Sequence, residues 1–212
     1  MKKILLIGDS IRIGYDKYVQ MAFDGVAQVY YPDVNCRFAA YVMRHLPDWK
    51  KTTGCGDDVD AVYWNAGLWD DLVMVDDQCL TPVEIYEYYI DRICKSIRIL
   101  FPSAKMIFAT STAVIEAIDP KLKKRTNENT RRYNAAAAKI VESHSGLVDD
   151  LFALTKNVPE NYHSDQTHYY TPEGTELLAA HVVETLENVL SIQGKPLEYK
   201  QLFVQAQNVI GE

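Results

Sequence analysis

The chain has 212 residues, 48% of them hydrophobic and 24% charged, a size and composition typical of a single α/β domain. Its formal net charge is −7 and no long basic face is apparent, which argues against a nucleic acid or an anionic membrane as partner. The apolar run after the N-terminal lysines is too short for a signal peptide, and no stretch reaches the roughly 18 apolar residues of a membrane span. We therefore expect a cytoplasmic protein without a membrane partner.

Strand and helix signals alternate five times along the chain. Short apolar or β-branched runs predict strands at 3–7, 26–31, 60–65, 105–110 and 147–149. Helical spacing of apolar residues predicts helices at 11–23, 38–49, 82–100, 129–144 and 171–190, and a last short helix in the tail 196–212. Strict alternation of this kind favours a parallel sheet covered by helices on both faces.

Turn and capping residues define several of these boundaries. Pro47, followed by a pair of glycines, is expected to interrupt the second helix. Thr81 is a predicted N-cap, with Pro82 at the first helical position and Glu84 completing a capping box. The polar stretch 111–127 is interpreted as a surface loop, and its basic cluster as solvated rather than anion-binding; the cluster consists of Lys121, Lys123, Lys124 and Arg125.

The four cysteines show neither CxxC spacing nor the spacing of a zinc finger. Disulfide frameworks are expected in small secreted domains rather than in a chain of this kind. The sequence therefore predicts free thiols at Cys36, Cys55, Cys79 and Cys94.

The first predicted strand stops abruptly at Gly8, Asp9 and Ser10. In open α/β sheets, ligands bind at the carboxyl ends of the strands, and a glycine lets the backbone turn so that the next side chains enter the crevice. Ser10 is therefore placed as a nucleophile would be. As an alternative, its hydroxyl could serve only as a helix cap.

A serine nucleophile needs a base to take its proton and a third group to orient that base. Among five histidines, His168 stands out because Asp165 precedes it by three residues in a loop before the last helix. The alternatives without catalysis are a capping role for Asp165 and a structural role for His168 as a hydrogen-bonded loop residue.

The combination of Gly8-Asp9-Ser10 near one end with Asp165-x-x-His168 near the other resembles the SGNH/GDSL hydrolase superfamily. The resemblance covers about residues 2–192 of a single domain, 1–212, and leaves 193–212 as a short extension. It implies a flavodoxin-like three-layer α/β/α sandwich with a five-stranded parallel sheet. It also implies a triad in which Ser10 attacks, His168 moves the proton and Asp165 holds the imidazole.

The same resemblance implies an oxyanion hole built from three donors. The backbone N–H of Ser10 is the first, and alignment of the following helix puts Cys36 at the position of the family's glycine donor. The family's GxND motif corresponds to residues 67–70, where Trp69 replaces the asparagine. Asn65 is the other candidate for the third donor; we favour it over its rival Trp69, since an indole N–H differs from an amide in bulk and geometry.

The resemblance implies a serine esterase that removes small acyl groups, such as acetyl, from a sugar or another small alcohol. An acyltransferase using the same acyl-serine is one alternative. A catalytically silent carbohydrate-binding or scaffold protein of the same fold is the other, with Trp69 marking a lost oxyanion hole. The substrate-binding residues stay unassigned, and the expected partner is a small acyl ester, an acylated sugar among them.

Several residues near these motifs have competing interpretations. Arg12 and Arg37 could meet an anionic substrate, but solvated arginines are the commoner case. His163 joins Asp165 and His168 in a set of zinc-ligand types, yet no further His/Cys cluster completes a site, so we expect no metal and no cofactor. Four aromatics could form a sugar-binding wall or pack into the core: Trp64, Trp69, Tyr169 and Tyr170.

Overall fold

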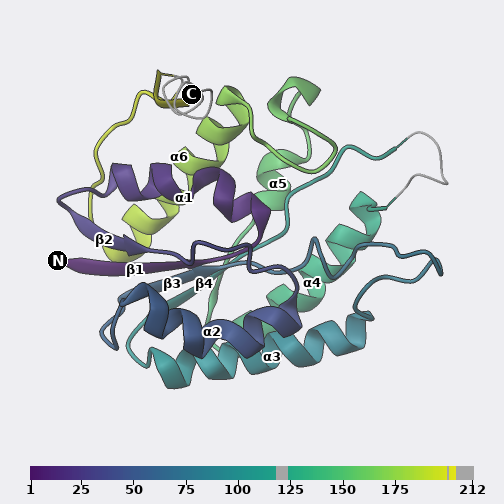
Figure 1. Cartoon of the computed structure of the whole chain (residues 1–212), viewed down its shortest axis with the longest axis horizontal. Helices are drawn as coiled ribbons and strands as arrows, with labels where there is room; N and C mark the ends of the chain where they lie inside the picture. Colours follow the sequence, from purple (N-terminus) through teal and green to yellow (C-terminus); the bar gives the residue numbers. More distant parts are fainter. Residues whose placement is uncertain (118–123, 200, 204–212) are drawn as a thin grey trace.

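The computed structural model describes residues 1–117, 124–199 and 201–203. Within them, five strands form one parallel sheet in the order β2-β1-β3-β4-β5 (Figure 1). The strands are β1 (Lys2–Ile7), β2 (Ala27–Tyr30), β3 (Ala61–Trp64), β4 (Lys105–Ala109) and β5 (Leu147–Asp149). This is the doubly wound, flavodoxin-like order. All strands are parallel, and the chain adds β2 on one side of β1 and then β3, β4 and β5 on the other. The predicted five-stranded parallel sheet is confirmed.

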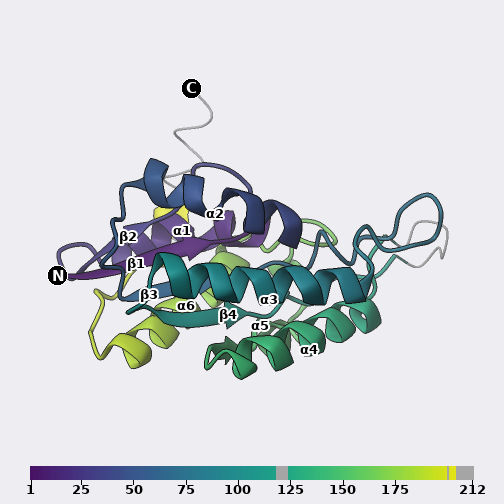
Figure 2. The same cartoon turned by 90° about the horizontal axis from the view of Figure 1, so that it is seen from below.

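Helices cover both faces of the sheet. They are α1 (Ser10–Ala22), α2 (Ala39–Thr53), α3 (Val83–Leu100), α4 (Asn127–Ser143), α5 (Leu151–Thr155) and α6 (Pro172–Leu190), with a 3₁₀ turn, η2 (Glu160–Tyr162). Helices α2, α3 and α4 lie together on one face, seen from below in Figure 2, and α1 and α6 lie on the other. The short elements α5 and η2 are absent from the predicted elements because neither spans two full helical turns.

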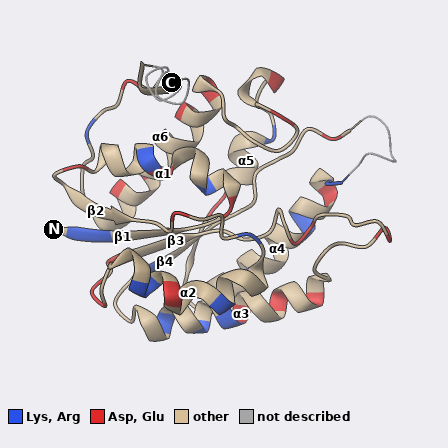
Figure 3. Ribbon diagram, viewed as in Figure 1, with Lys and Arg blue, Asp and Glu red and all other residues tan. Residues whose placement is uncertain are grey.

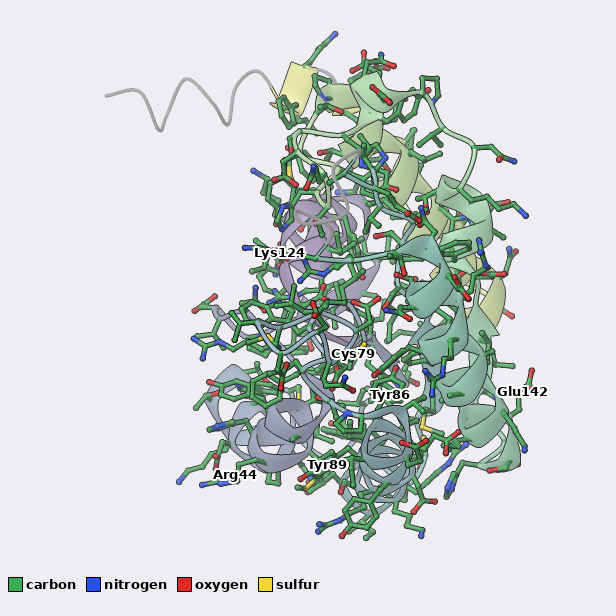
Figure 4. The ribbon with its side chains drawn as sticks, turned by 90° about the vertical axis from the view of Figure 1, so that its right-hand side faces the viewer. Arg44, Cys79, Tyr86, Tyr89, Lys124 and Glu142 are labelled. Carbon is green, nitrogen blue, oxygen red and sulfur yellow. The ribbon has the colours of Figure 1, made fainter. Side chains whose placement is uncertain are left out.

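Side chains of each strand alternate between two apolar cores. Leu5 and Ile7 of β1 pack with α2, α3 and α4, whereas Ile4 and Leu6 pack with α1 and α6. Because both faces are covered, the strand reads as a continuous apolar run. Figure 4 shows Tyr86 of α3 inside the molecule, where it is fully buried.

Pro47 does not interrupt α2, contrary to the prediction. The helix continues through it to Thr53 and ends at Gly54, whose φ of 68° is the left-handed conformation of a helix C-cap. Proline removes one N–H from the helix ladder. Leu46 and Trp49, buried on either side of it, offset that loss by anchoring the helix in the core.

Thr81 does not cap α3, which begins at Val83 after an N-cap at Pro82 that offers no side-chain hydrogen bond. Thr81 is buried instead: its N–H donates to the Asp70 carbonyl at 3.1 Å, and its own carbonyl accepts a hydrogen bond from the hydroxyl of Tyr133. These long-range contacts outweigh the local capping preference.

The beginning of the predicted surface loop 111–127 is buried, which corrects the prediction. Residues 111–114 are nearly inaccessible to solvent, and side chains form hydrogen bonds with their backbone groups in place of water. Asn134 bonds both the N–H and the carbonyl of Ser111, and the Thr155 hydroxyl accepts from the N–H of Ala113 at 3.0 Å. Lys121 and Lys123 lie outside the described residues.

All four cysteines lie in the described part of the chain and are free thiols, as predicted. Residues 199 and 201–203 of the tail are helical, while 204–212 lie outside the described residues. Among the helices described, none combines the length and apolar character that a membrane crossing requires. Acidic and basic residues are interspersed along α2 and α3 (Figure 3).

Candidate active site

Ser10 begins α1 directly after the turn that leaves β1. Asp9 is the N-cap of this helix, its carboxylate accepting the N–H of Ile11 at 2.9 Å. The turn passes so close to β3 that a Cβ on Gly8 would lie 2.0 Å from Oδ1 of Asn65, so the position requires glycine. The N–H of Ser10 has no partner within its helix, and the helix dipole adds partial positive charge there.

The structure brings Ser10, His168 and Asp165 together in one chain of hydrogen bonds. Nε2 of His168 lies 2.8 Å from Oγ of Ser10, and Nδ1 lies 2.7 Å from Oδ2 of Asp165. A carboxylate only accepts hydrogen bonds, so Nδ1 carries the proton and Nε2 is left to accept from the serine. This is the geometry that serine activation requires.

The local turn explains why a spacing of three residues makes Asp165 meet His168. Oδ1 of Asp165 accepts the backbone N–H groups of Thr167 at 2.7 Å and His168 at 2.9 Å, which folds the loop back on itself. The other carboxylate oxygen then faces the imidazole. Partial burial acts to raise the pKa of Asp165, but these N–H groups and His168 more than offset it, so the pKa is lowered and the carboxylate stays ionised.

The N–H of Cys36 is already engaged, which bears on its predicted oxyanion role. It donates to the Gly8 carbonyl at 3.1 Å, so donating to an oxyanion would require this bond to be exchanged. The Cys36 side chain is fully buried, and burial raises its thiol pKa to about 11. The thiol is therefore neutral at physiological pH.

Asn65 and Trp69, the rivals for the third donor, occupy different environments. Asn65 is 4% exposed and lies beneath the turn before Ser10, with Oδ1 lacking a hydrogen-bond partner. The nearby Asp9 carboxyl is buried, and its pKa is raised by burial and partly lowered again by the N–H of Ile11 and by Asn65. Trp69 lies half-buried farther along the same loop.

Arg12 is buried, not solvated. It is 1% exposed, pairs with Asp16 one helical turn away, and donates a second hydrogen bond to the carbonyl of Val34 at 2.6 Å. These contacts tie α1 to the loop that carries Cys36, which leaves Arg12 no charge free for a substrate. Arg37, in contrast, is exposed beside the ring of Tyr41.

Arg125 also departs from the solvated surface predicted for the basic cluster. Its side chain is 19% exposed, donates to the carbonyl of Leu68 and lies 3.7 Å from the buried carboxyl of Asp71. Burial raises the pKa of Asp71 to about 6 and that of neighbouring Asp70 to about 7. Arg125 thus contacts the segment 67–71, which includes the residues that correspond to the family's GxND motif.

The remaining candidates do not assemble into a second site. Among the described residues, no group of three or more His, Cys, Asp or Glu side chains is placed to hold a metal ion. The ring of His163 lies against that of Tyr169, with centroids 4.0 Å apart and planes inclined by 40°. Trp64 and Tyr169 are buried core residues, as the alternative to a sugar-binding wall predicts, while Tyr170 is half-buried beside His168.

Three features of this site have a weak signal in the sequence or none. Gly14 interrupts a helical pattern, a departure that can indicate a close contact. Asp9 before a helix is a recognisable N-cap. The supporting role of Arg125 has no local signal, because its partners lie more than fifty residues away.

Comparison with known proteins finds similarity in structure only. No protein-family model and no curated protein sequence matches the chain. Among solved structures, the lipase/acylhydrolase from Enterococcus faecalis superimposes with a TM-score of 0.70 at 19% identity, covering 93% of this chain and 100% of its own. The acetyl xylan esterase AlAXEase gives 0.69 at 18% identity, with coverages of 87% and 99%.

A catalytic mutant of an acetylxylan esterase from Geobacillus stearothermophilus superimposes with a TM-score of 0.67 at 16% identity, covering 89% of this chain and 94% of its own. At such identities the similarity establishes the fold, and it agrees with the resemblance carried by the two sequence motifs. The chain has the fold of the SGNH/GDSL hydrolases.

Proposed function

We propose that the protein is a serine esterase that hydrolyses esters of small acyl groups through an acyl-serine intermediate. The observation that carries the proposal is the continuous hydrogen-bonded chain from Ser10 through His168 to Asp165. Ser10 and His168 are 158 residues apart in sequence, which makes a purely local capping role a poor account of this contact.

In the proposed reaction, Oγ of Ser10 attacks the ester carbonyl as Nε2 of His168 takes the hydroxyl proton. The tetrahedral intermediate collapses, the imidazolium protonates the departing alcohol, and the acyl group stays on Ser10. Water, deprotonated by His168, then attacks the acyl-serine; the intermediate collapses, His168 returns the proton to Oγ of Ser10, and the carboxylic acid is released. Asp165, ionised throughout, holds the imidazole and offsets its positive charge.

The substrate class follows from the neighbours rather than from the site. Two of the similar structures are described as acetylxylan esterases, so acetylated carbohydrates are the first natural esters to test. An acyltransferase would form the same acyl-Ser10 and pass it to an alcohol, so product analysis with and without an added acceptor separates the two activities.

The first test is hydrolysis of 4-nitrophenyl acetate and butyrate by the wild type, Ser10→Ala and His168→Ala. We expect both variants to lose about 10³-fold or more in kcat/KM, because removing nucleophile or base disables the whole triad. Ser143→Ala and His45→Ala, on α4 and α2, are the matched controls and should keep full activity.

A catalytically silent binding protein is favoured by one observation, the engagement of the Cys36 N–H with the Gly8 carbonyl. Labelling with a fluorophosphonate probe separates the two functions. Loss of labelling in Ser10→Ala supports the esterase. A wild type that neither turns over esters through Ser10 nor labels would refute it and leave sugar binding without turnover as the function.

A further inference from the structure

Tyr170 contacts both members of the proposed nucleophile-base pair. Its ring stacks on the imidazole of His168 with centroids 4.8 Å apart and planes inclined by 29°. Its hydroxyl donates a hydrogen bond to the backbone carbonyl of Ser10. A single side chain therefore bridges the loop that carries His168 and the first turn of α1.

Helix α1 is shaped to receive this ring. A Cβ on Gly14 would lie 2.7 Å from Cε1 and 3.0 Å from Cδ1 of Tyr170, closer than packed atoms allow. Glycine is one of the poorest helix formers, yet it occupies an interior position of α1, one turn after Ser10. The unfavourable residue is explained by the close approach of the tyrosine ring.

The tyrosine is itself held at its backbone. Its N–H donates to Oγ of Ser164 at 3.3 Å, and the N–H of Ser164 donates to the carbonyl of His168 at 2.9 Å. Burial raises the pKa of the Tyr170 phenol to about 12, so the hydroxyl keeps its proton and can donate to Ser10 at neutral pH.

The imidazole of His168 needs such a second support. Asp165 orients it through one hydrogen bond, but the Asp165 side chain is 55% exposed, so water competes for that bond. The hydrogen bonds of the ring to Asp165 and Ser10 both lie at its edge, so a flat partner against the ring face adds a restraint on the tilt of the ring plane that they do not supply. Misplacement of a catalytic group by about 1 Å can cost on the order of 10²-fold in rate.

We propose that Tyr170 is a positioning residue of the triad, which stacks on His168 to fix its ring plane and ties that ring to the backbone of Ser10. Its catalytic effect rests on the proposed esterase function. The alternative is that Tyr170 only packs the loop onto α1, in which case its loss lowers stability without affecting the imidazole.

Two tyrosine variants separate the stack from the hydrogen bond. Tyr170→Phe keeps the ring and should lower kcat by only about threefold, whereas Tyr170→Leu should lower it by about 10- to 100-fold with KM within about twofold. Tyr169→Phe is the matched control, because it removes a comparable hydroxyl-to-carbonyl bond, to Ala113 at 2.8 Å, without touching the triad.

Gly14→Ala tests the same contact from the side of α1. In the wild-type background the added methyl should displace the Tyr170 ring and lower kcat to nearly the level of Tyr170→Leu. In the Tyr170→Leu background it should cause no further loss and should raise Tm, since alanine favours the helix. Additive losses of kcat would contradict the proposal.

A readout independent of turnover keeps the proposal separate from the esterase function. The Nδ1 proton that His168 donates to Asp165 should give a low-field proton NMR signal, assigned by its absence from His168→Ala. We expect the signal in the wild type and Tyr170→Phe, and broadening or loss in Tyr170→Leu at a temperature where the protein is folded.

The outcomes are distinguishable. Absence of Ser10-dependent turnover in the wild type refutes the esterase, and the NMR signal alone then decides whether Tyr170 orders the imidazole. If Tyr170→Leu retains wild-type kcat, KM and NMR signal, or if it only lowers Tm, Tyr170 is a packing residue and the positioning role is wrong.

Discussion

Three residues of the candidate site were identified from chemistry and the family pattern, and each has a local reason for its position. Asp165 folds its own loop through two backbone N–H groups, so its distance from His168 follows from a turn that short polar side chains commonly form. Ser10 follows a glycine that the approach of Asn65 requires. The residues predicted as donors of an oxyanion hole have no comparable local determinant.

Asn65→Ala and Trp69→Phe decide between the two rivals for the third oxyanion donor. We expect Asn65→Ala to lower kcat by about 10²- to 10³-fold, because an amide that donates to the oxyanion acts in the transition state. Trp69→Phe should stay within about threefold of the wild type, as should Asn161→Ala, an exposed control on η2. Loss of activity in Trp69→Phe alone would instead identify the indole as the donor.

At the scale of elements, contacts across the sheet edge define where the helices begin. Asp70 lies in the loop after β3, and its Oδ2 accepts the N–H of Ala39, the first residue of α2, at 3.0 Å. Its backbone carbonyl accepts the N–H of Thr81, at 3.1 Å, just before α3. One buried residue therefore contacts the starts of two helices, α2 through its carboxyl and α3 through its backbone.

Asp70 makes stability depend on pH. Burial raises its pKa to about 7 in the folded protein against 3.8 for the exposed group, so between these values the folded state holds a proton that the unfolded state has lost. The free energy of unfolding therefore decreases with rising pH. The contribution of Asp70 is lost between about pH 4 and pH 7, by on the order of 4 kcal/mol, and does not change above pH 7.

Asp70→Asn removes the titration while keeping an oxygen that can accept from Ala39. Relative to this variant, the wild type should lose stability from pH 4 to pH 7, measured by urea denaturation at each pH. Asp76→Asn, an exposed control, should run parallel to the wild type. Parallel curves for Asp70→Asn and the wild type would mean that Asp70 is ionised without penalty.

At the scale of the whole molecule, the two cores share one sheet. Alternate residues of β1 face α2, α3 and α4 or α1 and α6, so neither layer can unfold without exposing the strand that supports the other. We propose that residues 1–212 form a single domain that unfolds cooperatively.

Shortening one buried side chain in either core tests this proposal. Ile90→Ala, on the side of α3, and Leu186→Ala, on the side of α6, should each lower the free energy of unfolding by about 2–5 kcal/mol, because both side chains are fully buried. Far-UV circular dichroism and tryptophan fluorescence should show one coincident transition. Ile99→Ala, 78% exposed on α3, should change stability by less than about 0.5 kcal/mol. Two separate transitions, each shifted by one variant only, would indicate two domains.

The sequence by itself determined the alternation of strands and helices, the parallel sheet and the positions of Ser10, Asp165 and His168. These follow from periodicity, turn chemistry and short motifs, all of which act over a few neighbouring residues. The start of α3 differs from the prediction by one residue, and there a local capping preference competed with distant contacts of Thr81.

Only the tertiary structure decided which polar groups meet across the sheet edge. The burial of Arg12, the engagement of the Cys36 N–H by Gly8 and the support of residues 67–71 by Arg125 depend on partners from other elements. Tyr170 is the clearest case, since nothing near it in sequence indicates that it reaches Ser10 and Gly14. Local patterns encode periodicity and turns, whereas such contacts arise when the folded sheet brings distant segments to one edge.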